Sequence, residues 1–328
     1  MKLKRMFSNT WKTLIWPVAI YLVFFLATRL SNTSGNFGTL QSLETVLQQS
    51  ILCAMMALAM SCNMMNGRWD FSIGIITMIA SFIASGYVKQ LGMGAYGLVL
   101  LCIVFATILC LINGALYLLL KVPSLVVSIG MLMVYETVSL IVNSGKGAKV
   151  NGLSYTIFGR SPYIYILALV MFLIFYVIYS HTRFGYHVRA LGNNQLIANN
   201  IGINETKNTI LCYVLCGVFI GVTAAINVSM KGSIEPSSTF NNNMGMMFAA
   251  FPAVFIGLYL SRYTNFVVGV FVGAVCMKFL SAGILALGLP SAVQDIGVGL
   301  FLLLFIALTT NQGRFQDWRA RIKRLALS

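Results

Sequence analysis

The feature that most constrains this chain is a succession of apolar runs, each about 20 residues long, which continues from one end of the sequence to the other. A helix of about 20 residues is ~30 Å long, the thickness of the hydrocarbon core of a bilayer. Hydrophobic residues make up 59% of the chain and charged residues only 9%, whereas a soluble domain carries roughly 25% charged residues. The sequence therefore predicts an all-α, polytopic membrane protein.

We expect about ten transmembrane helices, and an even number places both termini on one side of the membrane. The predicted spans are 14–30, 46–65, 71–88, 96–120, 124–143, 162–180, 208–230, 245–260, 265–284 and 292–310. Most of the 22 Lys and Arg residues then fall on the side of the termini, and basic residues concentrate on the cytoplasmic face of membrane proteins. We therefore predict cytoplasmic termini and one transmembrane domain over residues 1–328.

The net charge of +15 raises the question of a nucleic-acid partner. The basic residues gather at the termini and in short loops instead of along one face, so we expect a lipid bilayer and no nucleic acid. The seven cysteines lie in apolar runs without a metal-binding spacing and are interpreted as packing residues. The sequence contains no GxxxxGK[ST] phosphate-binding loop, so the chain does not bind ATP by that device.

Two short segments echo one another: PSLVVSIG at residues 123–130 and PSAVQDIG at residues 290–297. Each opens a predicted span, and in the predicted topology the two spans enter the membrane from opposite sides. One interpretation is a 5+5 inverted repeat, a common plan of transporters. The other is chance agreement in a chain rich in Val, Ile and Gly.

A break separates the second and third spans at NGRWDFSIG, residues 66–74. Gly67 ends one helix, and Asp70 stands just before the next apolar run. An Asp at an N-cap accepts hydrogen bonds from the next turn, here from the N–H groups of Ser72 and Ile73, and its charge suits the helix dipole. The structural interpretation is that Asp70 caps the helix that begins after the break. The functional one is that the break lines a transport pathway, where broken helices are tolerated.

Three segments carry a resemblance to a known family. GRWDFSIG (67–74) resembles the G-x-x-D-[LF]-S-[VI]-G motif of the membrane permeases of ribose-type bacterial ABC importers, the branched-chain amino acid/ribose-like permeases. TRFGYHVRALGNNQLIANNIGI (182–203) is similar to the cytoplasmic loop of that family, with Tyr186 in place of the usual Arg and Ile197 in place of an Ala. SMKGSIEPS (229–237) resembles an outer loop of the same family.

The cytoplasmic loop, residues 181–207, has glycines on both sides of a helix-compatible stretch, 194–200, which is rich in small and amide side chains. Its composition suits either a solvated loop or a short surface helix that docks on a partner. The resemblance implies the second, with the ATPase subunit as the partner. The residues that we expect to carry this coupling are Thr182, Phe184, Gly185, Gly192, Asn193, Ala198 and Gly202.

The resemblance also implies the other components of the transporter. These are ABC ATPase subunits that bind the ATP, an extracytoplasmic solute-binding protein and a second permease copy or paralogue, in a bacterial inner membrane. The chain itself is then a transport subunit without an ATPase site, catalytic residues or a cofactor. The solute implied is a ribose-type sugar, or else a nucleoside or autoinducer sugar.

Some residues depart from the family pattern. Segment 256–269 lacks most of the glycines of the family's G-G-x-S-L-x-G-G-x-G loop, residues 243–246 lack its acidic pair, and Glu136 is an unusual acid within a span. A carboxylate within a span is costly and often functional, and Lys278 is a candidate partner for it. These departures suggest a diverged subunit, such as one half of a heterodimer.

A pathway for a polar solute requires polar side chains within the spans or at their ends. The candidates are Asn63, Asn66, Asp70, Ser72, Asn113, Glu136 and Gln294. The rival interpretation is an ion-coupled secondary transporter, which needs several ionisable residues in the membrane. Only Glu136, with Asp295 near a helix start, supports that alternative.

Overall fold

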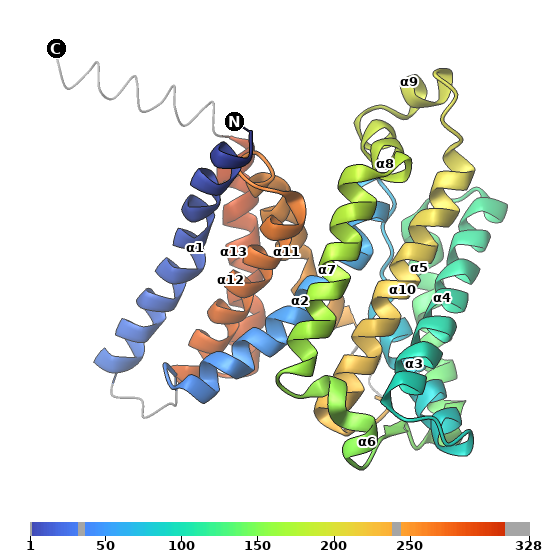
Figure 1. Ribbon diagram of the computed structural model, residues 1–328, viewed down its shortest axis with the longest axis horizontal. Coiled ribbons are helices and arrows are strands. Elements are labelled where there is room, and N and C mark those ends of the chain that lie inside the picture. Colours follow the sequence, from blue (N-terminus) through green and yellow to red (C-terminus); the bar gives the residue numbers. More distant parts are fainter. Residues whose placement is uncertain (1, 32–36, 238–243, 312–328) are drawn as a thin grey trace. The chain divides into compact units, whose positions relative to one another are not determined.

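The computed structural model describes residues 2–31, 37–237 and 244–311, and in these ranges most residues are helical (Figure 1). The long helices are α1 (Lys2–Leu30), α2 (Leu40–Met65), α3 (Ile73–Gln90), α4 (Ala95–Leu120), α5 (Ser124–Ile141), α7 (Tyr163–His181), α10 (Glu205–Lys231), α11 (Met244–Leu260), α12 (Phe266–Ala286) and α13 (Ser291–Thr310). Each predicted span falls on one of them. Among the described residues, eight helices are long and apolar enough to cross a membrane, and α11 and α13 contain shorter apolar segments. The all-α, polytopic fold is confirmed.

Short elements connect the long helices. Between α5 and α7 lie η1 (Val142–Gly145), β1 (Ala148–Lys149), α6 (Leu153–Thr156) and η2 (Ile157–Gly159). The outer-loop motif at 229–237 contains β2 (Ser233–Ile234), which pairs antiparallel with β1. The loop between α7 and α10 forms two further helices, α8 (Arg183–Asn193) and α9 (Gln195–Asn200).

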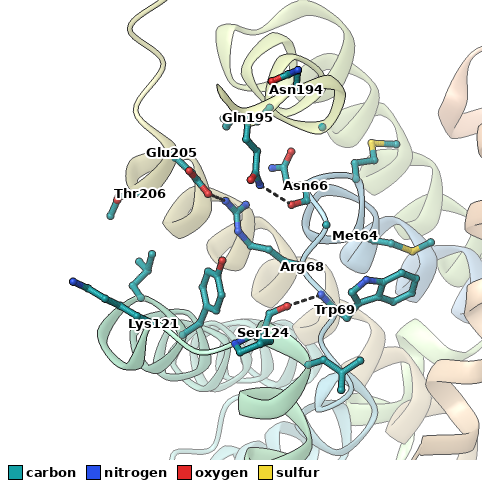
Figure 2. Close-up of a pocket in the computed structure, with 18 of the residues that line it drawn as sticks. Met64, Asn66, Arg68, Trp69, Lys121, Ser124, Asn194, Gln195, Glu205 and Thr206 are labelled. Atoms are coloured by element: carbon teal, nitrogen blue, oxygen red, sulfur yellow. Dashed lines mark hydrogen bonds and ion pairs between the residues drawn. The ribbon is translucent and has the colours of Figure 1, made fainter. Parts of the chain in front are cut away.

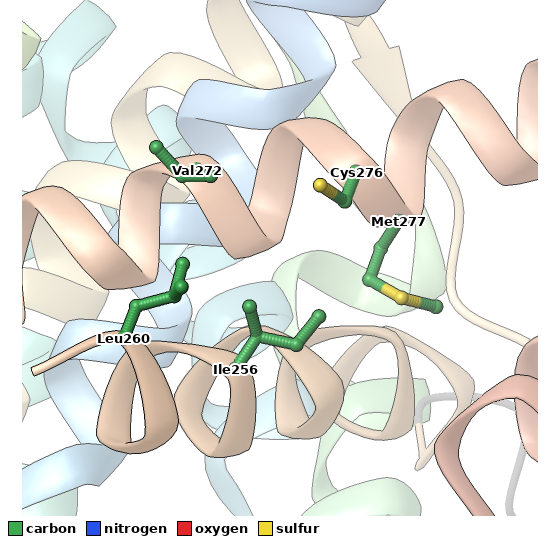
Figure 3. Packing of buried hydrophobic residues seen from close by; sticks show 5 residues of the cluster. All are labelled: Ile256, Leu260, Val272, Cys276 and Met277. Atoms are coloured by element: carbon green, nitrogen blue, oxygen red, sulfur yellow. The ribbon is translucent and has the colours of Figure 1, made fainter. Parts of the chain in front are cut away.

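The chain divides into two compact units. Unit 1 comprises residues 1–47 and 255–328. Its core includes a cluster in which Ile256 and Leu260 of α11 lie opposite Val272, Cys276 and Met277 of α12 (Figure 3). All five side chains are at least nine-tenths buried, so that aliphatic and sulfur-containing side chains fill this helix crossing.

Unit 2 comprises residues 48–254 and contains α3–α10 with most of α2 and α11. Helix α10 is its central element, because it packs against both α4 and α3. Glycines permit the closest of these approaches: a Cβ on Gly217 would collide with the backbone of Thr107, and one on Gly221 with the backbone of Ile103. The segment of α10 from Ile220 to Ser229 is buried throughout.

The structure also bears on the cysteines and on the two Pro-Ser segments. The seven cysteines, all within the described ranges, are buried and form no disulfide, as expected of packing residues. Helices α5 and α13 both begin at a Ser that follows a Pro, as the echo between residues 123–130 and 290–297 suggested. Because the two helices belong to different units, the inverted relation between them stays a prediction.

Candidate functional site

The break between α2 and α3 is held by backbone hydrogen bonds and by α5. The N–H groups of Asn66 and Arg68 both donate to the carbonyl oxygen of Asn63, at 3.1 and 3.0 Å, and close the end of α2. Gly67 between them has φ +71°, a conformation that favours glycine. The N–H of Trp69 donates to Oγ of Ser124, the first residue of α5, at 3.0 Å. The break is therefore an ordered turn that is fixed to a neighbouring helix.

Asp70 lies before the N-cap position of α3 and accepts hydrogen bonds from the residue that occupies it. Its Oδ1 accepts from the N–H and the hydroxyl of Ser72, at 3.0 and 2.5 Å. The helix begins only at Ile73, so that the N-cap position belongs to Ser72. The predicted N-cap position of Asp70 is thus wrong by two residues, because residues 71 and 72 form a turn before the helix starts.

A buried polar network extends from this turn. Nδ2 of Asn113 in α4 donates to Oγ of Ser72, and the hydroxyl of Tyr135 in α5 donates to Oδ1 of Asn113 at 3.1 Å. Burial raises the pKa of the Asp70 carboxyl above its usual range, although the hydrogen bonds from Ser72 oppose this shift. The network fixes the start of α3 to α4 and α5.

Most of the pathway candidates are closed to solvent in this conformation. Those of unit 2, which are Asn63, Asn66, Asp70, Ser72, Asn113 and Glu136, are all buried. Asp70, Ser72 and Asn113 lie together in one network, and Asn66 donates to the sulfur of Cys212 at 3.7 Å. Gln294 belongs to unit 1 and is half-buried. Their role along a pathway stays a prediction, as does the pairing of Glu136 with Lys278.

The loop of residues 181–207 contains two capped helices, which agrees with the helical one of the two alternatives that its composition allowed. Asn194 caps α9 by accepting from the N–H of Ile197 at 3.1 Å, and α9 matches the helix-compatible stretch. Thr182 caps the preceding helix α8, accepting from the N–H of Gly185 at 3.4 Å. A Cβ on Gly185 would collide with the backbone of Tyr179. Gly202, with φ +89°, reverses the chain after α9.

The expected docking residues differ in their exposure. Gly192 and Asn193 are exposed and Phe184 is half-buried, whereas Ala198 is only 2% exposed. The side chain of Ala198 therefore packs within the protein and does not offer the small docking contact expected of it. The exposed face of the loop carries large apolar side chains instead, with Leu196 76%, Ile197 60% and Ile201 70% exposed. Three such residues in an otherwise polar segment are a sequence signal that could have identified this face.

The loop lies directly against the break. A Cβ on Gly192 would lie 2.6 Å from the carbonyl oxygen of Met65, so that only glycine permits this approach. Nε2 of Gln195 donates to the carbonyl oxygen of Asn66 at 3.3 Å (Figure 2). The hydroxyl of Tyr179, at the end of α7, donates to Sδ of Met65 at 3.4 Å. Movement of α8 and α9 would therefore act on the end of α2.

A cavity of about 1120 Å³ opens between the break, the α4–α5 turn and the loop. Its walls include Arg68, Lys121 and Glu205 (Figure 2). Arg68 is only 2% exposed; its Nη2 lies 2.9 Å from Oε1 of Glu205, and its guanidinium lies 5.8 Å from the ring centre of Tyr117. The cavity thus brings together residues that the topology prediction assigned to the cytoplasmic side.

Comparisons with known proteins identify a family and several similar chains. Residues 42–309 match the family model of the branched-chain amino acid transport system permease component. The ribose import permease protein RbsC of Escherichia coli (strain K12) is 25% identical over 321 residues, which are 94% of this chain and 97% of the relative. The autoinducer 2 import system permease protein LsrC of Yersinia pseudotuberculosis (serotype O:1b, strain IP 31758) is 25% identical, covering 87% of this chain and 82% of the relative.

A third relative is the fructose import permease protein FrcC of Rhizobium meliloti, 21% identical over 89% of this chain and 85% of the relative. The match to the family model covers far more than half of the chain. Together with the apolar helices, it identifies a multi-pass protein of a bacterial inner membrane. The chain belongs to the family of the branched-chain amino acid transport system permease component.

Proposed function

We propose that this chain is the permease subunit of an ABC importer that moves a sugar or sugar-like solute into a bacterial cell. Separate ATPase subunits would bind and hydrolyse the ATP, an extracytoplasmic binding protein would deliver the solute, and a second permease copy or paralogue would complete the pathway. Relatives named for ribose, autoinducer 2 and fructose support this solute class. Family membership argues against the ion-coupled alternative.

One observation carries the proposal: the loop of α8 and α9 presents an apolar face outward and contacts the helix break inward. Outward, Leu196, Ile197 and Ile201 are well exposed, and exposed apolar clusters with a polar rim mark interaction sites. Inward, Gly192 and Gln195 meet the end of α2. An ATPase bound to the outward face could therefore displace the break through the loop.

The test is the retention of the ATPase by the permease. In Ile197→Asp, a carboxylate would have to lose its water at the interface, so the affinity for the ATPase should fall at least about tenfold, or ~1.4 kcal/mol. The matched control is Leu153→Asp in α6, because Leu153 is 63% exposed in a loop predicted to lie outside. Detergent-solubilised complexes would be captured through a tag on the permease and the bound ATPase quantified.

The expected result is loss of the ATPase in Ile197→Asp and its full retention in Leu153→Asp, with both permeases monodisperse. Equal retention by both variants would place the ATPase contact elsewhere and would overturn the docking proposal. Loss in both would indicate a general effect of an added acid and would also count against it.

A further inference from the structure

One carboxylate joins the docking loop to the helix break. Glu205 is the first residue of α10, directly after the N-cap Asn204. Its Oε1 lies 2.9 Å from Nη2 of Arg68 in the break, and its Oε2 accepts from Nδ2 of Asn199 in α9 at 3.2 Å. Figure 2 shows the contact between Glu205 and Arg68 at the edge of the cavity. Glu205 therefore holds the break with one oxygen and α9 with the other.

The burial of the two charges is unequal. The side chain of Glu205 is 33% exposed, whereas that of Arg68 is 2% exposed. Nε and Nη1 of Arg68 have no hydrogen-bond partner among the described residues, so that Glu205 is its one carboxylate partner there. Removing one member of a buried pair leaves an uncompensated charge, which is strongly unfavourable. Arg68 is therefore expected to follow Glu205 when the start of α10 and α9 move.

The contacts continue beyond Arg68 into the membrane part of unit 2. The next residue, Trp69, is bonded to α5 through Ser124. Asp70 then leads through Ser72 to Asn113 in α4. A displacement of Arg68 therefore acts on a turn that is joined to several helices of unit 2.

We propose that Glu205 is a positioning residue for transport, which transmits the movement of α9 to the helix break by holding Arg68. The proposal rests on the proposed function, because it requires an ATPase that moves the loop. It goes further in naming the side chain that connects the loop to the break. Docking and transmission are separate: Leu196, Ile197 and Ile201 hold the ATPase, and Glu205 passes its movement on.

The experiment measures movement of the break without a transported solute. Met64, which lines the cavity, would be replaced by Cys as a reporter; the seven native cysteines are buried. The rate at which a thiol reagent modifies Met64→Cys would be measured on the purified permease–ATPase complex with and without Mg-ATP. We expect ATP to change this rate about 5- to 150-fold, the range typical of coupling between two sites, and we expect Glu205→Gln to lose most of that change.

Three further variants separate transmission from stability. Arg68→Met with Glu205→Gln removes both charges, which is often neutral for stability, so its thermal midpoint should exceed that of Glu205→Gln while the ATP effect stays lost. Glu205→Asp keeps the carboxylate and should retain part of the ATP effect. Glu44→Gln, near the start of α2, removes a carboxylate elsewhere and should leave the ATP effect unchanged.

An ATP effect that persists in the double variant would assign Glu205 a purely structural role and overturn the inference. The same follows if ATP never alters the labelling of Met64→Cys. Loss of the ATPase from Glu205→Gln would make Glu205 a docking residue, which overturns the inference but leaves the proposed function intact. Failure of the proposed function is recognised separately, because the unmodified permease would then capture no ATPase at all.

Discussion

At the scale of single residues, the polar side chains near the break act first as structure. Asp70 places one oxygen on Ser72 and leaves its Oδ2 without a hydrogen-bond partner among the described residues. Asn113 and Tyr135 complete the network from α4 and α5. Within a membrane protein little water can replace such contacts, so every bond that a neighbouring residue supplies counts.

The prediction at this scale concerns Asp70. Asp70→Ala removes the acceptor for both bonds from Ser72 and should lower the free energy of unfolding by ~1–3 kcal/mol. Asp70→Asn keeps an acceptor oxygen at the same place and should cost less than half of that. The measurement is the thermal midpoint of the detergent-solubilised permease. Equal losses in Asp70→Asn and Asp70→Ala would show that the charge stabilises the turn and the acceptor oxygen does not.

A pH dependence follows from the raised pKa of Asp70. Because the folded state favours the protonated carboxyl, stability should be highest below the ordinary pKa of 3.8 and should fall as pH rises through the higher folded-state pKa. Asp70→Asn cannot ionise, so the difference in thermal midpoint between it and the unmodified protein should shift in favour of the variant as pH rises. A difference that does not vary with pH would contradict the burial effect.

At the scale of elements, the packing of unit 2 depends on glycines where helices cross. Gly217 and Gly221 lie one turn apart on α10 and bring its backbone against α4. The same small-xxx-small spacing occurs at Gly269–Gly273 in α12, where a Cβ on Gly269 would lie 2.9 Å from the carbonyl oxygen of Gly257 in α11. Small residues let membrane helices approach closely enough for dense van der Waals packing.

The prediction at this scale compares two glycines. Gly217→Ala places a methyl group against the backbone of Thr107 and should destabilise the fold by ~1–3 kcal/mol, as overpacking does. Gly130→Ala is the matched control, because Gly130 lies in α5 with open space around its Cα. It should be neutral or stabilising by up to ~1 kcal/mol. Similar thermal midpoints for the two variants would contradict a close α4–α10 crossing.

At the scale of the whole molecule, unit 2 has a distinct group of residues at each of two ends. The cavity gathers the break, the α4–α5 turn and the α8–α9 loop. The β1–β2 ribbon joins the segment after α5 to the segment after α10. The predicted topology groups the connections in the same way. It places the break, the α4–α5 turn and the α8–α9 loop in the cytoplasm, and the two segments joined by the ribbon outside.

The prediction at this scale is the sidedness of the loops. Leu153→Cys in α6 should react with an impermeant thiol reagent added to intact cells, whereas Leu196→Cys in α9 should react only after the membrane is opened. Both positions are well exposed, and the native cysteines are buried, so the unmodified chain serves as the blank. The opposite labelling pattern would refute cytoplasmic termini.

The spans and their order followed from the sequence alone. A bilayer requires a helix to satisfy its own backbone hydrogen bonds, so that about 20 apolar residues encode a span without reference to its neighbours. The composition of residues 194–200 was compatible with α9 but suited a solvated loop equally well, and the family resemblance favoured the helix. The cap of α9 is itself local, because Asn194 and Ile197 are three positions apart. The start of α3 was missed by two residues because the turn at Phe71 and Ser72 precedes it.

Tertiary structure decided which side chains face one another. Arg68 and Glu205 are 137 residues apart, and no periodicity within either segment indicates that they pair. The burial of Ala198 and the exposure of Ile197 depend on how α9 lies against its neighbours. A local pattern can specify a helix and its cap, whereas the partner of a charge and the face that remains exposed depend on packing between helices distant in the sequence.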